Sequence, residues 1–190
     1  MLISDSKKFI FFHLYKTAGT SLSEVLKPHV KPHHHKHFKV CDYLKGNYMD
    51  TRYKDYFTFG FVRNPWDWQV SLYHYMLMDH GHFQHNLVKS FKDYSEYVDW
   101  RVHEDCKPQY TFFSEKGDLD SPITLDYIGK FEKLSEEVNY VKNRLGLEIN
   151  DLPHLVKSNR QPYQTYYDKK TRDMIGQAYH KDVETFNYAF

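Results

Sequence analysis

The stretch that decides the fold is FIFFHLYKTAGTS, residues 9–21. It begins with an apolar run typical of a buried strand over residues 9–14 and leads, through a loop of small residues, into a helix predicted over 21–27. A strand, a small-residue loop and a helix in this order direct free backbone N–H groups and the positive end of a helix dipole toward an anion. The stretch therefore predicts a phosphate-binding turn.

The loop itself carries the donors that such a turn needs. Lys16 adds a full positive charge, Gly19 allows close approach of the backbone, and Thr20 and Ser21 add hydroxyl groups. The Gly-x-x-x-x-Gly-Lys-Ser/Thr spacing of the usual P-loop is absent. An ordinary strand-to-helix turn capped by Thr and Ser would have the same pattern, so the loop alone leaves both interpretations open.

A second strand-to-helix junction is FTFGFVRNPWDWQVS, residues 57–71. We predict a strand over residues 56–62 and a helix that starts at Pro65, with Asn64 as its N-cap. Arg63 then lies at the carboxyl edge of the sheet, where open α/β folds bind ligands, and its planar guanidinium suits a phosphate. Ser71, about two turns into the helix, would add a hydroxyl. The alternative is that Arg63 pairs with an acidic neighbour and Ser71 has no ligand.

The rest of the chain continues the alternation of strands and helices. The patterns predict helices over residues 38–45, 91–101, 134–145 and 169–180, with Gly146 ending the third, and an extended segment over 123–131. The fold class predicted is α/β, a mostly parallel sheet flanked by helices, in a P-loop-like nucleotide-binding arrangement. No repeat or Gly/Ser linker divides the 190 residues, so we expect one domain over 1–190.

Composition excludes several function classes. The 26 basic and 25 acidic side chains nearly cancel, which disfavours a nucleic-acid stripe or a polybasic membrane face. The longest purely apolar run, residues 9–12, is too short to span a bilayer. Residues 1–8 lack the features of a secretory signal, and two cysteines far apart favour a reducing compartment. We therefore expect a cytoplasmic protein; its oligomeric state is not indicated.

Together the motifs resemble those of a known family. Residues 16–21 are similar to the 5′-phosphosulfate loop of sulfotransferases that use 3′-phosphoadenosine 5′-phosphosulfate (PAPS), and residues 59–73 are similar to their 3′-phosphate motif. The resemblance is to the Golgi-type carbohydrate (heparan and chondroitin) sulfotransferases and their bacterial relatives. Residues 127–134 and the tail from Asn159 also match, so the resemblance covers nearly the whole chain. Two departures are Tyr15, where the family usually has proline, and Trp68, where it usually has a basic residue.

The resemblance implies transfer of a sulfuryl group from PAPS to a hydroxyl acceptor, expected to be a carbohydrate. It assigns the cofactor to Lys16, Thr17, Ala18, Gly19, Thr20, Ser21, Arg63 and Ser71. It also places Arg160, with Lys157 and Ser158, in a segment that closes over the cofactor, although a plain solvated loop explains that segment equally well. Lys16 would have a catalytic role as well, since it would stabilise charge on the reacting oxygens.

The family implies a histidine base between the two phosphate motifs. The alignment places His34 there, with His35 and then His37 as the neighbouring choices. An imidazole has an ordinary pKa near neutrality and suits general base catalysis. A solvated polar loop is the alternative. No metal site is expected, because no nearby Cys or spaced carboxylate completes a tetrahedral set.

Two rival functions remain open from the sequence. A nucleotide-dependent kinase would use the Lys16 loop for ATP, but the usual P-loop spacing is absent and no acidic residue ends the second strand to hold Mg²⁺. A non-catalytic protein that binds PAPS, or its product 3′,5′-bisphosphoadenosine, would keep the motifs without turnover.

Overall fold

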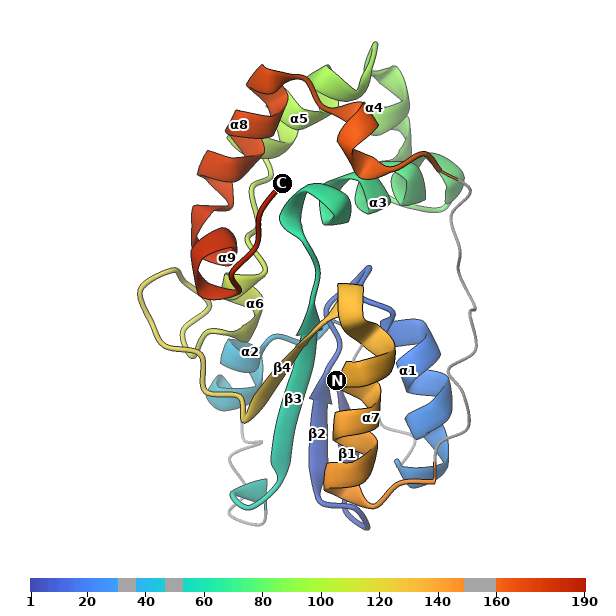
Figure 1. The fold of residues 1–190 in the computed structure, drawn as a ribbon, viewed down its shortest axis with the longest axis vertical. Coiled ribbons are helices and arrows are strands. Elements are labelled where there is room, and N and C mark those ends of the chain that lie inside the picture. Colours follow the sequence, from blue (N-terminus) through green and yellow to red (C-terminus); the bar gives the residue numbers. More distant parts are fainter. Residues whose placement is uncertain (31–36, 47–52, 149–159) are drawn as a thin grey trace. The chain divides into compact units, whose positions relative to one another are not determined.

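The computed structural model describes residues 1–30, 37–46, 53–148 and 160–190, which form two compact units (Figure 1). The first, which we call the sheet unit, comprises Met1–Arg63 and Gln109–Lys157. The second, the helical unit, comprises Asn64–Pro108 and Ser158–Phe190. Their boundary falls between Arg63 and Asn64, inside the second motif. One domain over 1–190 stays a prediction, and each unit is described by itself.

The sheet unit contains a four-stranded sheet in the order β1-β2-β3-β4. These strands are β1 (Leu2–Ser4), β2 (Phe9–Phe12), β3 (Phe57–Val62) and β4 (Tyr127–Lys130). β2, β3 and β4 are parallel and β1 is antiparallel to β2, so the predicted mostly parallel sheet is confirmed. The sequence did not predict β1, because three residues are too few to show alternation.

Helices cover both faces of this sheet (Figure 1). On one face, α1 (Gly19–Leu26) and α7 (Leu134–Leu145) bury the apolar core with the side chains of β2 and β3. Members of that core include Phe9, Phe11, Leu22, Leu26, Phe59, Phe61, Val138 and Val141. On the other face, α2 (Val40–Lys45) places Tyr43 edge-on to Phe12, at 5.7 Å between ring centroids, and α6 (Tyr110–Phe113) places Phe113 against Gly60. Short 3₁₀ turns, η1 (Lys27–His29) and η3 (Phe131–Lys133), follow α1 and β4.

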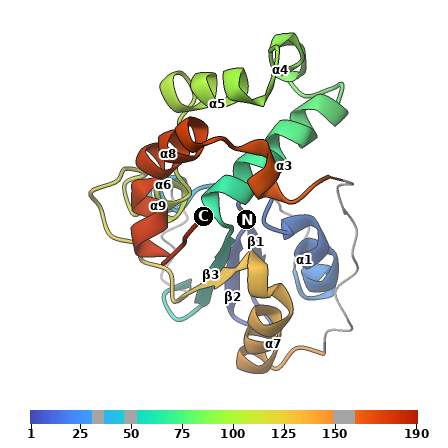
Figure 2. The ribbon, with the colours of Figure 1, turned by 45° about the horizontal axis from the view of Figure 1, so that its top comes forward.

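The helical unit is built around α3 (Pro65–Met78). This helix starts as predicted: Asn64 accepts hydrogen bonds from the backbone N–H groups of Trp66 and Asp67, and Pro65 occupies the first turn. The other elements are α4 (His85–Ser90), α5 (Tyr94–His103), η4 (Tyr163–Tyr166), α8 (Lys169–Ala178) and α9 (His180–Thr185). α8 packs against both α3 and α5 (Figure 2). No helix of the described ranges is long and apolar enough to cross a membrane.

Some helix boundaries differ from the prediction. The helix predicted over residues 91–101 is wrong at its start: α4 ends at Ser90, and α5 begins at Tyr94 because Asp93 caps it. The helix predicted over 169–180 ends at Ala178, and α9 begins at His180. The stop at Gly146 is confirmed by its left-handed backbone, with φ of 56°.

Gly60, at the centre of β3, gives a test of this packing. A Cβ there would lie 2.4 Å from Cε1 of Phe113 and 3.2 Å from the carbonyl oxygen of Phe12. We expect Gly60→Ala to lower the free energy of unfolding by about 1–3 kcal/mol through overpacking, measured by urea denaturation. Gly81→Ala is the control, because the nearest atom to its Cβ would be 3.4 Å away. Equal stability of both variants would contradict the described packing of α6.

Candidate functional site

The loop between β2 and α1 has an unusual backbone. Lys16 and Ala18 have φ values of 62° and 61°, in the left-handed region that non-glycine residues rarely adopt. Such residues cost roughly 1–3 kcal/mol each and are concentrated at ligand sites. The hydroxyl of Thr17 donates to the carbonyl oxygen of Leu14 at 2.8 Å and its side chain is buried, which helps to fix the loop. Any role of Thr17 toward a ligand therefore falls to its backbone.

The first turn of α1 offers donors to an anion. Ala18 is the N-cap and makes no side-chain cap. Among the described residues, the backbone N–H groups of Gly19, Thr20 and Ser21 have no hydrogen-bond partner. The same holds for the hydroxyls of Thr20 and Ser21; Thr20 is exposed and Ser21 is buried. A helix N-terminus in this state is a ready anion site.

Gly19 has a packing role that the sequence did not predict. A Cβ at this position would lie 1.8 Å from Cδ2 of His13, so only glycine lets the imidazole pack against the start of α1. The His13 ring is buried and lies parallel to Phe11, at 5.8 Å and 10°. The close approach expected at Gly19 is therefore made by a side chain. The signal was a histidine at the end of a buried strand, six residues before the glycine.

Arg63 is held at its backbone by Gln109. Its N–H donates to Oε1 of Gln109 at 2.9 Å, and Nε2 of Gln109 donates to its carbonyl oxygen at 2.7 Å. Gln109 is fully buried and Arg63 is 7% exposed. The exchanged pair fixes the end of β3. Gln109 was not predicted, because nothing local in the sequence connects two residues 46 positions apart.

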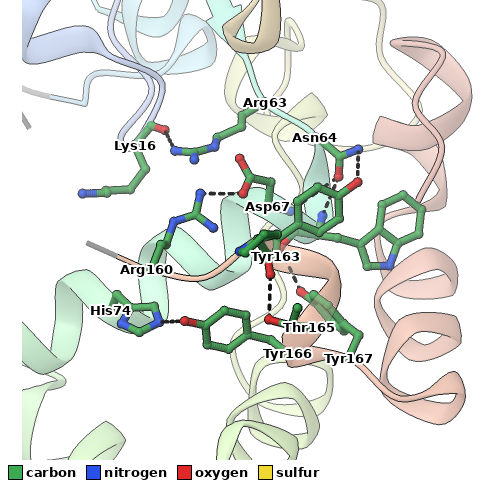
Figure 3. Close-up of polar contacts among 12 residues, drawn as sticks. Lys16, Arg63, Asn64, Asp67, His74, Arg160, Tyr163, Thr165, Tyr166 and Tyr167 are labelled. Atoms are coloured by element: carbon green, nitrogen blue, oxygen red, sulfur yellow. Dashed lines mark hydrogen bonds and ion pairs between the residues drawn. The ribbon is translucent and has the colours of Figure 1, made fainter. Parts of the chain in front are cut away.

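The guanidinium of Arg63 joins the two motifs. Its Nη1 donates to the carbonyl oxygen of Lys16 at 3.1 Å (Figure 3), and its Cζ lies 4.1 Å from the centroid of the Phe131 ring. The two junctions that the sequence shows separately thus meet within the sheet unit. The side chain of Arg63 is directed to the loop by a hydrogen bond and a cation–π contact.

In the helical unit, one face of α3 carries Asp67, Ser71 and His74, spaced four and three residues apart. Asp67 forms an ion pair with Arg160, at 2.5 Å between Oδ1 and Nη2 (Figure 3). Both side chains are largely buried, with 14% and 12% exposed. The Ser71 hydroxyl has no partner among the described residues. Arg160 is therefore oriented by Asp67 toward the helix that carries Ser71.

His74 extends this cluster. Its Nε2 lies 2.8 Å from the hydroxyl of Tyr166 (Figure 3). Burial, and then the charge of Arg160, lower the pKa of His74 below its ordinary value of 6.5. The sequence analysis did not single out His74; the signal was its position three residues after Ser71.

The tyrosines of residues 163–167 are used for packing. The Tyr167 hydroxyl donates to the carbonyl oxygen of Trp66 at 2.9 Å and lies 2.6 Å from the Tyr94 hydroxyl. Burial, the first cause, raises the pKa of Tyr167 well above its ordinary value. Trp68, where the family usually has a cation, is fully buried and packs edge-on to Tyr179. This position therefore contributes to the core.

The histidine candidates are placed only in part. His34 and His35 lie outside the described residues, so their role stays a prediction. His37 is described: its Nδ1 lies 3.1 Å from the carbonyl oxygen of His13, and its ring is edge-on to Tyr15 at 5.6 Å. A carbonyl oxygen can only accept, so Nδ1 donates and the neutral ring has its lone pair on Nε2. Within the described ranges, no group of three or more His, Cys, Asp or Glu could hold a metal ion.

Comparison with known proteins decides the family, since the model of the family described as "Sulfotransferase family" matches residues 1–189. This chain belongs to the sulfotransferase family. Membership indicates a transferase of the EC 2.8.2 type, and the α/β sheet unit agrees with the fold of such an enzyme.

The chain is also 28% identical, over 120 residues, to the SbcC component of the nuclease SbcCD from Staphylococcus haemolyticus (strain JCSC1435). That similarity covers 60% of this sulfotransferase-family chain but only 11% of the staphylococcal protein. No solved structure matches.

Removing the charge of Arg160 should raise the pKa of His74. We expect a titration midpoint below 6.5 in the wild type, measured from the imidazole resonances by NMR, and a higher midpoint in Arg160→Gln, because a nearby cation disfavours protonation. Arg172→Gln is the matched control, since Arg172 is half-exposed and pairs with Asp173. An unchanged midpoint in Arg160→Gln would show that the charge of Arg160 does not act on His74.

Proposed function

We propose that this protein transfers a sulfuryl group from PAPS to a hydroxyl group of a carbohydrate. The observation that carries the proposal is the hydrogen bond from Arg63 to the carbonyl oxygen of Lys16. It joins the motif that the resemblance assigns to the 5′-phosphosulfate with the motif that it assigns to the 3′-phosphate. Family membership supports sulfuryl transfer in general; the donor, the acceptor and the base are proposed here.

The residues present fit the sulfated end of PAPS. The three partnerless N–H groups at the start of α1, with the hydroxyls of Thr20 and Ser21, match a tetrahedral anion that needs several donors. The left-handed residues Lys16 and Ala18 hold these groups in place before a ligand arrives. Lys16 would add the charge that a loose, anionic transition state requires.

The 3′-phosphate falls to Arg63, with Ser71 and Arg160. Arg63 is fixed at its backbone by Gln109, so little side-chain freedom remains to be lost when it binds a phosphate. Arg160 is fixed by Asp67, and the Ser71 hydroxyl has no other partner in the described ranges.

When bound, PAPS supplies the activated sulfuryl group. Lys16 and the N-terminus of α1 then stabilise negative charge on the leaving oxygen, while the sugar hydroxyl is held in line. A histidine, with His34 first and His35 next, removes the proton of that hydroxyl, which typically contributes about 10²- to 10⁴-fold to the rate.

The kinase alternative has no support in the site. Val62 is followed by Arg63 rather than by an acidic residue that would organise Mg²⁺. The first carboxylate of α3, Asp67, is paired with Arg160. A ligand carrying two phosphates and no metal fits these residues better.

Nucleotide preference tests the proposal directly. We expect 3′,5′-bisphosphoadenosine to raise the melting temperature more than ADP does, with or without Mg²⁺; saturation at 100 times Kd corresponds to about 2.7 kcal/mol. Arg63→Ala should lose most of this stabilisation. Arg172→Ala, which removes a half-exposed arginine of the helical unit, should keep it. Equal shifts with ADP, or a requirement for Mg²⁺, would favour a kinase.

Replacement of the histidines tests the base. We expect His34→Ala or His35→Ala to reduce transfer of label from PAPS to a glycan panel by about 10²- to 10⁴-fold, with unchanged stabilisation by 3′,5′-bisphosphoadenosine. His103→Ala, an exposed histidine on α5, is the control. A loss confined to His37→Ala would move the assignment to His37, and binding without any transfer would support the non-catalytic alternative.

A further inference from the structure

A cavity of about 480 Å³ lies within the helical unit, beside α5. Its volume falls in the range of roughly 300–1,000 Å³ typical of small-molecule sites. The residues that line it include Phe91, Asp93, Glu96, Asp99, Trp100 and Lys170. None of them has a role in the proposed nucleotide site, and the cavity needs an explanation of its own.

Aromatic rings form one wall of this cavity. Trp100 is half-buried, and its ring is held by Phe91 at 5.7 Å and by the fully buried Tyr97 at 5.9 Å. Its Nε1–H has no partner among the described residues. A fixed indole with a free donor presents an apolar face and a polar edge together. The C–H face of a pyranose ring and its hydroxyls match these two surfaces.

Carboxylates form the polar wall. Oδ1 of Asp93 accepts hydrogen bonds from the N–H groups of Ser95 and Glu96, at 2.9 Å and 3.2 Å. Oε2 of Glu96 accepts from the N–H of Lys92 at 2.7 Å. The second oxygen of each carboxylate accepts nothing from the residues described. These acceptors are held in place by the backbone and remain able to bind hydroxyl donors.

The charge of the lining selects among carbohydrates. Asp93, Glu96 and Asp99 contribute three negative charges, and Lys92 and Lys170 contribute two positive charges, so the net charge is −1. A sulfated sugar would be repelled by this excess, whereas a neutral sugar would not.

We propose that the cavity beside α5 is a subsite for an unsulfated, neutral oligosaccharide. It would hold the acceptor chain before sulfation, a role that depends on the proposed function, although sugar binding itself does not. The wall of Trp100 and Phe91 stacks on the pyranose rings, and Asp93 and Glu96 accept from their hydroxyls.

Tryptophan fluorescence of the full chain tests the subsite without turnover. Of the three tryptophans, Trp66 and Trp68 are buried, at 5% and 0% exposed, so Trp100 reports on added sugar. We expect saturable shifts with neutral tetrasaccharides (cellotetraose, chitotetraose or maltotetraose) and roughly fivefold weaker binding for each added sulfate. Choline serves as a probe for the alternative ligand, a quaternary ammonium ion.

Variants measured by calorimetry complete the test. Trp100→Ala should weaken binding of the neutral sugar at least tenfold, and Phe83→Ala, which removes an 85% exposed ring elsewhere in the unit, should not. Asp99→Lys reverses the net charge from −1 to +1 and should reverse the preference toward the sulfated sugar. This variant keeps the proposal testable if Trp100→Ala fails to fold.

Three outcomes would overturn the subsite: no neutral tetrasaccharide binds, Trp100→Ala binds as the wild type does, or choline binds and the sugars do not. Stabilisation by 3′,5′-bisphosphoadenosine is measured separately. Failure of the nucleotide test with intact sugar binding would therefore reject the proposed function and leave the sugar site, and the reverse result would reject only the subsite.

Discussion

The buried guanidinium of Arg63 is the feature on which the sheet unit's site depends. Removing a charge from water costs several kcal/mol unless hydrogen bonds and polarisable neighbours compensate. Here the backbone of Arg63 exchanges two hydrogen bonds with Gln109, and its side chain contacts the Lys16 carbonyl and the Phe131 ring. The ends of β3 and β4 and the loop after β2 are thereby brought to one place, which is the arrangement a ligand with two anionic groups requires.

The loop before α1 is held against its own conformational preference. Two left-handed residues, Lys16 and Ala18, would relax if the loop were free. The Thr17 hydroxyl, the packing of His13 against Gly19 and the bond from Arg63 together oppose that relaxation. The consequence is a helix start whose N–H groups already face outward, so that binding an anion requires little reorganisation.

Local chemistry made part of this structure predictable. Asn64 and Pro65 start α3 through contacts within one turn, and apolar runs reveal β2 and β3 wherever they pair. The missed features depend on residues distant in sequence: Gln109 reaches Arg63 across 46 positions. The ion pair of Asp67 with Arg160 spans 93 positions, and no local pattern encodes such contacts.

Charge also separates the two proposed binding functions. The nucleotide residues, Lys16, Arg63 and Arg160, are cationic, whereas the cavity beside α5 carries a net charge of −1. Sulfuryl transfer adds a negative charge to the acceptor and leaves two phosphates on the nucleotide. The cavity would therefore bind the product more weakly than the acceptor, because the lining that accommodates a neutral sugar repels a sulfated one. Differential binding of this kind favours release of the modified chain, while the spent nucleotide remains held by the cations.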